Sequence, residues 1–242
     1  MILVDERIRD IEYKYLEEDL KQEVKRIPLS DDVYEEISGH SDIFYTKIGG
    51  KIYAAPNAPI IENNFTIGEE KVSRKYPEDV KYNICQIGKN VIGSKYADSK
   101  IKDKINIYVN QGYTKCSISV TGDNSCITTD EGIYKTLKEH NIDIVLIKDD
   151  NIKLLDKNKL ISKMTGFIGG ASAVIGNEFI IFGDIDRSRS HKVDSVFIIG
   201  MNDGIFPSIN KVEGFLNDAD REILKQNGIE LAKGSLEQLY ED

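Results

Sequence analysis

The sequence predicts an α/β protein built from a repeated strand–strand–helix–strand unit. Segments of alternating apolar residues flank glycine-containing turns, and this pattern recurs along the chain, as in repeat architectures. Alternation on both sides of a turn that accepts positive φ is typical of a β-hairpin. A helical pattern and a further strand follow one of the hairpins. Four hairpins are expected, in Ile43–Ala54, Ile84–Ile92, Ser117–Thr128 and Ala173–Phe182.

The elements around these hairpins complete the unit. An amphipathic helix near Ile11–Lys21 and a strand at Glu23–Leu29 form its closing half at the start of the chain. After the third hairpin, Thr128 and Glu131 have the spacing of a capping box. A helical face with Ile133 and Leu137 follows, and then a strand at Ile142–Ile147. We expect a core that includes Val145, Leu146, Ile147, Ile180 and Ile181.

Five segments carry a resemblance to a known fold: Ser38–Phe44, Tyr76–Val80, Asn110–Ser117, Thr128–Ile133 and Gly166–Ser172. They are similar to an uncharacterised clostridial-type family assigned to the pentein fold, in which five ββαβ units surround a central site. That fold also hosts the guanidine-modifying enzymes (GME). The resemblance covers residues 1–185. It implies an incomplete pentein-like α/β propeller that binds a guanidino or amino-acid-like small molecule.

The last quarter of the chain has a different character. A polar, basic run at Asp186–His191 leads into an apolar strand at Val196–Gly200, and an Asn-Asp-Gly-x-Phe-Pro loop ends at Pro207. This resembles the AddB-type subunit of the ATP-dependent helicase–nucleases. We assign residues 1–185 to the pentein-like domain and residues 186–242 to a strand–helix segment of helicase-like origin. The join at Gly183–Ile185 has no linker, which favours a chimeric reading frame.

Composition limits the classes of function. The net charge of −9 argues against broad nucleic-acid binding, because phosphate binding needs clustered cations. Cys85, Cys116 and Cys126 are an odd number without CxxC spacing, which indicates reduced thiols and no zinc site. The first residues lack the pattern of a signal peptide, and no apolar run has membrane-spanning length. We therefore expect a cytoplasmic protein with no membrane partner, no metal and no cofactor.

His40 and Asp42 are the candidate catalytic residues. In a His-x-Asp pair at the edge of a strand, both side chains point the same way, so they can face a central channel together. The alternative is a turn in which Ser41 and Asp42 bond to the backbone. Guanidine-modifying enzymes attack with a cysteine in the last repeat, which the helicase-like tail replaces here. The three cysteines are therefore interpreted as small buried hydrophobes.

Weaker candidates lie elsewhere in the chain. Asp130 and Glu131 could bind a ligand, although capping of the following helix explains both. Arg187, Arg189 and Lys192 could contact phosphate, or form part of a solvated connector. The glycine-rich Gly166–Ser172 precedes a strand and lacks Gly-Lys-Ser/Thr, so it predicts a packed turn rather than a nucleotide loop.

The functional prediction is a pentein-fold small-molecule-binding protein without complete guanidine-modifying catalysis, joined to a non-catalytic AddB-like segment. The alternative is a part of the AddB-type subunit of an ATP-dependent helicase/deoxyribonuclease, which acts in double-strand-break repair and recombination. In that case the partners are DNA and the A-type helicase–nuclease subunit, provided that the tail keeps its family role. This chain alone is expected to be inactive as an enzyme.

Overall fold

The computed structural model describes residues 1–147, 152–176, 178–182 and 196–199. The chain divides into two compact units, Met1–Met201 and Asn202–Asp242. The second unit lies outside the described residues. The sequence predicts a helix there at Ala219–Gln226 and a capping box at Ser235 and Gln238, and both stay predictions.

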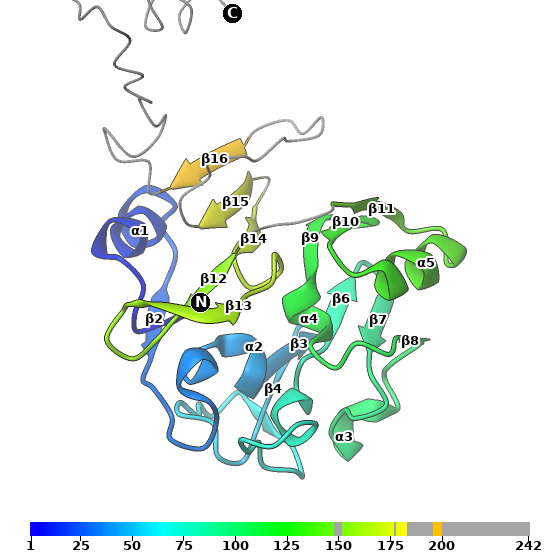
Figure 1. Cartoon of the computed structure of the whole chain (residues 1–242), viewed down its shortest axis with the longest axis horizontal. Coiled ribbons are helices and arrows are strands. Elements are labelled where there is room, and N and C mark those ends of the chain that lie inside the picture. Colours follow the sequence, from blue (N-terminus) through cyan, green and yellow to red (C-terminus); the bar gives the residue numbers. More distant parts are fainter. Residues whose placement is uncertain (148–151, 177, 183–195, 200–242) are drawn as a thin grey trace, which may run out of the picture. The chain divides into compact units, whose positions relative to one another are not determined.

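A repeated three-stranded sheet dominates this unit (Figure 1). In each repeat, an antiparallel hairpin is joined by a third strand that runs parallel to the second. The four sheets are β3 (Tyr45–Ile48), β4 (Lys51–Ala54) and β5 (Thr66–Ile67); β6 (Cys85–Ile87), β7 (Asn90–Gly93) and β8 (Ile107–Tyr108); β9 (Ile118–Gly122), β10 (Ser125–Thr128) and β11 (Asp143–Leu146); and β14 (Ser172–Ile175), β15 (Glu178–Phe182) and β16 (Val196–Ile199). The four expected hairpins are confirmed.

Helices lie at two places in the repeat. Helices α3 (Ser99–Lys102) and α5 (Glu131–Glu139) connect the second and third strands of their sheets, so these two repeats have the full strand–strand–helix–strand order. Short helical turns precede the hairpins, namely η2 (Glu35–Ile37), α2 (Ser41–Phe44), η3 (Glu78–Val80) and α4 (Thr114–Ser117).

The start of the chain forms a partial repeat. Strands β1 (Ile2–Asp5) and β2 (Val24–Ile27) pair in parallel, and the chain between them forms α1 (Asp10–Lys14) and the π-helical turn η1 (Tyr15–Asp19). The helix and strand expected here are confirmed, with shorter bounds. A two-stranded hairpin that was not predicted, β12 (Lys153–Leu155) and β13 (Ile161–Thr165), lies between the third and fourth repeats.

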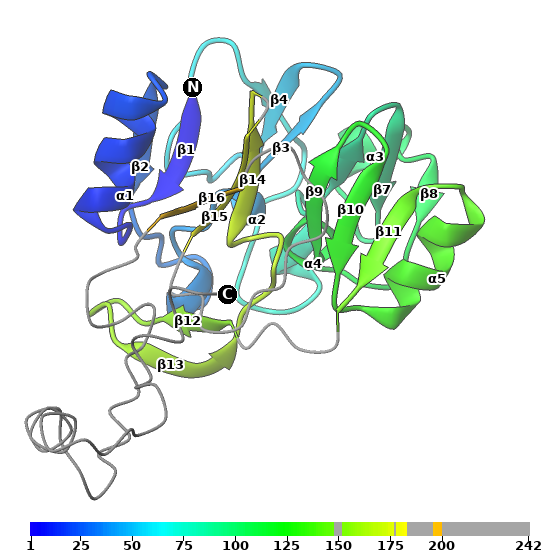
Figure 2. The same cartoon turned by 90° about the horizontal axis from the view of Figure 1, so that it is seen from above.

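The first strands of successive hairpins are neighbours. Strand β3 contacts β6, β6 contacts β9, and β9 contacts β14, while β1 contacts α2 (Figures 1 and 2). Polar side chains join some of these neighbours: the Thr46 hydroxyl donates to the Ile84 carbonyl at 3.0 Å, and the Ser119 and Ser172 hydroxyls lie 2.6 Å apart. The described strands form six small sheets and no closed barrel. The propeller arrangement stays a prediction.

Of the five side chains expected in the core, only one is fully buried. Ile180 is fully buried, but Leu146 is 37% exposed, and Val145, Ile147 and Ile181 are only partly buried. Strand β11 lies at the edge of its sheet, so its side chains alternate between core and solvent. Ile142 and Ile144 are the side chains that pack into the core there, against α5 and β10.

The strand expected at Val196–Gly200 is confirmed as β16 over Val196–Ile199. It pairs in parallel with β15, and Phe179 lies opposite Val196. This strand therefore occupies the third position of the fourth sheet. Among the described residues, no helix has both the length and the apolar character needed to span a membrane.

Candidate small-molecule site

Side chains from several loops meet where the first strands of the hairpins begin. Asp42 lies three residues before β3, Asn83 two residues before β6, and Cys116 two residues before β9. Gly169 lies three residues before β14. Because the first strands are neighbours, the short helices α2 and α4 converge with the loops before β6 and β14. Repeat-equivalent positions that are far apart in sequence therefore form one cluster.

Asn83 holds this cluster together. Its side-chain amide nitrogen donates to the Asp42 carbonyl at 2.9 Å and to the Cys116 sulfur at 3.0 Å. Its oxygen accepts from the backbone nitrogens of Lys115 at 2.6 Å and Cys116 at 3.1 Å. The Cys116 thiol in turn donates to Asp42 Oδ2 at 3.1 Å. Asn83 is fully buried, whereas Asp42 is only partly buried and retains access to solvent.

The glycine-rich loop closes against the same backbone. The Gly169 nitrogen donates to the Cys116 carbonyl at 2.7 Å, and the Lys115 ammonium donates to the Gly169 carbonyl at 2.9 Å. A Cβ on Gly169 would lie 2.3 Å from the Lys115 and Ile118 carbonyl oxygens, so no larger residue fits. This packed turn is the structure that the sequence predicted for Gly166–Ser172.

His40 lies at the edge of the cluster. Its side chain is 26% exposed, and its Nε2 is 4.0 Å from Asp5 Oδ2. Burial lowers the pKa of His40, although the negative charges of Asp42 and Asp5 oppose this change. The imidazole is therefore neutral at neutral pH and could accept a proton. His40 is the N-cap residue of α2 and Asp42 is the second residue of this helix. The expected position of the pair at the edge of a strand, with both side chains pointing the same way, is therefore wrong, because the pair lies on a helical turn.

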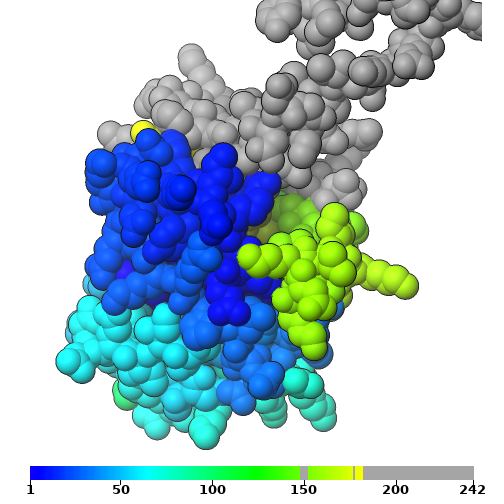
Figure 3. Space-filling model, turned by 90° about the vertical axis from the view of Figure 1, so that its left-hand side faces the viewer, coloured from blue at the N-terminus to red at the C-terminus, as the bar shows by residue number. Residues whose placement is uncertain are grey.

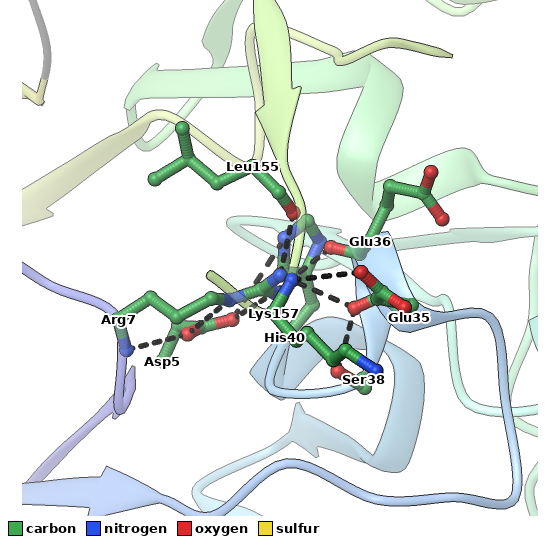
Figure 4. A network of polar contacts seen from close by, with 8 residues as sticks. All are labelled: Asp5, Arg7, Glu35, Glu36, Ser38, His40, Leu155 and Lys157. Atoms are coloured by element: carbon green, nitrogen blue, oxygen red, sulfur yellow. Dashed lines mark hydrogen bonds and ion pairs between the residues drawn. The ribbon is translucent and has the colours of Figure 1, made fainter. Parts of the chain in front are cut away.

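A buried arginine, Arg7, binds Asp5, the carboxylate that lies beside His40. The Arg7 guanidinium donates to both carboxylate oxygens of Asp5, at 2.8 and 2.6 Å, and to the backbone carbonyls of Glu35, Glu36 and Leu155. Figure 4 shows the guanidinium between these groups. Burial alone would raise the pKa of Asp5, but the hydrogen bonds and charge of Arg7 outweigh it and hold this pKa below its usual value. Arg7 thus joins β1, η2 and the β12–β13 hairpin.

A further buried carboxylate, that of Asp79, lies beside the aromatic side chain of Tyr113. Asp79 is fully buried, and its Oδ2 accepts a hydrogen bond from the Tyr113 hydroxyl. Among the described residues, its Oδ1 has no hydrogen-bond partner. Burial raises the pKa of Asp79, although the Tyr113 hydrogen bond opposes this. The Tyr113 ring stacks on Phe167 with centroids 5.9 Å apart, and it also packs against Tyr76.

The surroundings of Cys116 keep its sulfur protonated. Burial, then the charge of Asp42 and the hydrogen bond to it, raise the pKa of the Cys116 thiol well above its usual range. The thiolate is the nucleophilic form of cysteine, so this thiol is not activated for attack. Burial also raises the pKa of Cys85 to about 11 and that of Cys126 to about 12.

This arrangement predicts the effect of Asp42→Asn on thiol chemistry. Loss of the negative charge should lower the pKa of Cys116, and each unit of pKa gives about tenfold more thiolate. We expect Cys116 to be alkylated by iodoacetamide at least about tenfold faster at mildly alkaline pH, with Cys85 and Cys126 unchanged as internal controls. Site-resolved mass spectrometry measures the three rates. An unchanged rate at Cys116 would contradict the role given to Asp42.

The other predicted residues lie apart from this cluster. Asp130 is the N-cap of α5, since its Oδ1 accepts from the Ile133 nitrogen at 2.8 Å. Thr128, expected to begin a capping box, instead donates to the Ser117 carbonyl. Glu131 is exposed and pairs with Lys135. A cavity of about 460 Å³ adjoins Asp130, but none of the cluster residues lines it.

Arg187, Arg189 and Lys192 lie outside the described residues, so their candidate role stays a prediction. Within the described ranges, no three His, Cys, Asp or Glu side chains are grouped as a metal site requires.

Comparisons with known proteins match most of the chain to one family and parts of it to another protein. The model of a family of unknown function, DUF6873, matches residues 3–202. The B-type subunit of the ATP-dependent helicase/deoxyribonuclease of Clostridium novyi is 35% identical over 101 residues, which are 41% of this chain and 9% of that protein. The protein of the same name from Clostridium acetobutylicum is 50% identical over 62 residues, 26% of this chain and 5% of that protein.

The corresponding protein of Ruminiclostridium cellulolyticum is 43% identical over 63 residues, 26% of this chain and 6% of that protein. The chain thus spans less than a tenth of the length of these relatives. The DUF6873 match leaves 42 of the 242 residues outside it, so an alignment of 62 residues shares at least 20 with that range. The two resemblances therefore overlap along the chain.

Proposed function

The chain belongs to DUF6873, a family of unknown function, and we propose that it is a pentein-like protein that binds a small guanidino or amino-acid-like cation without hydrolysing it. The observation that carries this proposal is the partly exposed Asp42 carboxylate in a cluster of converging loops. A carboxylate pairs well with such a cation through charge-assisted hydrogen bonds.

The groups that surround Asp42 favour an external cation. The partner of Asp42 Oδ2 is a neutral thiol, so the carboxylate charge is not neutralised there. The Arg7 guanidinium is saturated by Asp5 and by backbone carbonyls, and Lys115 donates to Gly169. Tyr113 stacks on Phe167, and both lie in segments that precede the first strands of the third and fourth hairpins.

Hydrolysis of a guanidinium needs features that this cluster lacks. The reaction requires a thiolate that attacks the guanidinium carbon and a base that activates it. Cys116 is buried beside a carboxylate that raises its pKa, and it comes from the third of the four hairpin repeats rather than the last. The same carboxylate that attracts the cation therefore disfavours the nucleophile.

We expect no ammonia or citrulline release from arginine, agmatine or methylated arginine by the purified chain. The assay compares the wild type with single Cys85→Ala, Cys116→Ala and Cys126→Ala variants, and a coupled assay for ammonia provides the measurement. Turnover that only one of these replacements abolishes would overturn the non-catalytic proposal and identify the nucleophile.

A second candidate function is favoured by the partial relatives. We propose as the alternative that the AddB-like segment places the chain in the AddB-type subunit of a helicase/deoxyribonuclease, which acts on DNA together with the A-type subunit. The partial identity to proteins of that name supports it. Co-purification with the A-type subunit, lost when residues 186–242 are replaced by an unrelated linker, would favour this function. Agmatine binding without co-purification would favour the first.

A further inference from the structure

The β12–β13 hairpin presents an unusual surface. Leu160, Ile161 and Met164 are 63%, 77% and 41% exposed, which makes three large apolar side chains accessible within five residues. The segment 153–165 also contains four lysines and one aspartate, in a chain with a net charge of −9. Figure 3 shows this hairpin beside the N-terminal residues of the same face. The hairpin is therefore a basic, apolar projection on an acidic protein.

The hairpin is held in a defined position. Arg7 donates to the Leu155 carbonyl at 2.6 Å, and Ser162 donates to a Glu36 carboxylate oxygen at 2.9 Å. At the tip, Asp156 Oδ1 accepts from the backbone nitrogens of Asn158 and Leu160, at 2.8 and 2.9 Å. Because the backbone of this turn is already fixed, it loses little conformational freedom when the hairpin binds a partner, which favours a specific contact.

An acidic surface with its own exposed apolar residue lies beside this hairpin. The segment 10–19, which forms α1 and η1, contains five acidic residues and one lysine. Glu12 is buried and pairs with Arg9, whereas Ile11 is 53% exposed. Glu17, Glu18 and Asp19 are exposed. The hydrogen bond and charge of Arg26 lower the pKa of Asp10, and the charge of Lys159 adds to this effect.

We infer that this composite surface is a two-fold interface between two copies of the chain. In a two-fold dimer, each surface meets the same surface of its partner, so the basic hairpin of one copy faces the acidic α1–η1 segment of the other. Ile11, Leu160 and Ile161 then lie in the apolar centre, and the lysines and glutamates form the rim. A two-fold interface requires that each chain carries both complementary surfaces, and this chain carries both the basic hairpin and the acidic α1–η1 segment.

A second copy fits this surface better than a polyanion does. The hairpin has a net charge of +3, and the remainder of the chain has a net charge of −12. A nucleic acid that approached the lysines would therefore be repelled by the acidic α1–η1 segment. The hairpin also lacks the arginine and aromatic residues that nucleic-acid contacts favour. The exposed lysines disfavour pairing of the hairpin edges, so the contact is made by side chains.

Charge-reversal variants of the full chain test this interface in sedimentation velocity experiments. Lys159→Glu/Lys163→Glu makes the hairpin acidic, and Glu17→Lys/Glu18→Lys/Asp19→Lys makes α1–η1 basic. We expect each variant alone to dimerise at least about tenfold more weakly than the wild type, because like charges then face each other. High salt should weaken the wild-type dimer. The control variant Lys51→Glu/Lys89→Glu changes the net charge by the same amount as Lys159→Glu/Lys163→Glu. Its two exposed lysines lie at the turns of the first and second hairpins, so it should leave dimerisation unchanged.

Mixing the two variants gives the decisive result. In a mixed pair, the acidic hairpin of one variant faces the basic α1–η1 segment of the other, and the two remaining surfaces are complementary as well. We therefore expect heterodimers to form when the variants are combined. A wild type that stays monomeric at high concentration and low salt would overturn the inference. A mixture that forms no heterodimer would overturn it too.

Discussion

Replacement of Arg7 by alanine is expected to lower the free energy of unfolding by about 3–5 kcal/mol, because removal of one partner of a buried ion pair leaves the other charge uncompensated. Arg7 is 5% exposed and bonds to both oxygens of Asp5 and to three backbone carbonyls. Those carbonyls belong to η2 and to β12. The variant should therefore loosen the attachment of the hairpin as well as the fold.

Urea unfolding followed by circular dichroism measures this loss. Arg74→Ala is the matched control, since Arg74 is exposed and also donates to a backbone carbonyl, that of Asp31. We expect Arg74→Ala to change the free energy of unfolding by less than about 0.5 kcal/mol. If Arg7→Ala were equally mild, the network of Figure 4 would not have the structural role assigned to it.

The hairpins were predictable because their signal is local. Gly49, Gly88 and Gly176 adopt positive φ values of 57°, 53° and 64°, so the glycine turns that the sequence shows are turns that the backbone requires. Alternation of apolar residues then fixes the strands on either side. The third strand of each repeat is short or lies at a sheet edge. An apolar run there does not indicate burial: in the run Ile144–Ile147, only the Ile144 side chain is buried.

The sequence pattern does not predict the β12–β13 hairpin, and the reason is different. Its strands expose most of their side chains, so they lack the alternation that marks a half-buried strand. Its position depends instead on Arg7 and Glu36, which lie more than 100 residues earlier in the chain. Contacts over such separations leave no periodic signal in the sequence.

The sequence indicates Asp42 as a candidate site residue, but it does not indicate the partners of Asp42. Asn83 and Cys116 come from different repeats and meet Asp42 only because the first strands of the hairpins are neighbours. Comparison of the positions just before each hairpin could have found them, since all three lie two or three residues before a strand. Asp79 and Tyr113 carry no such positional signal.

Asp42→Asn is expected to abolish most of the binding of a guanidino cation. The substitution keeps the shape of the side chain but removes its charge, and a hydrogen bond to a charged group contributes about 1.5–3 kcal/mol. Affinity for agmatine should therefore fall at least about tenfold. Asp123→Asn is the matched control, because Asp123 is an exposed carboxylate at the far end of β9 from the cluster.

Calorimetric titration of agmatine into the wild type, Asp42→Asn and Asp123→Asn tests the central claim most directly. We predict that the wild type and Asp123→Asn bind agmatine with the same affinity and that Asp42→Asn loses at least about tenfold. Absence of agmatine and arginine binding to the wild type, or equal affinity of the wild type and Asp42→Asn, would contradict the assignment of this cluster as a cation-binding site.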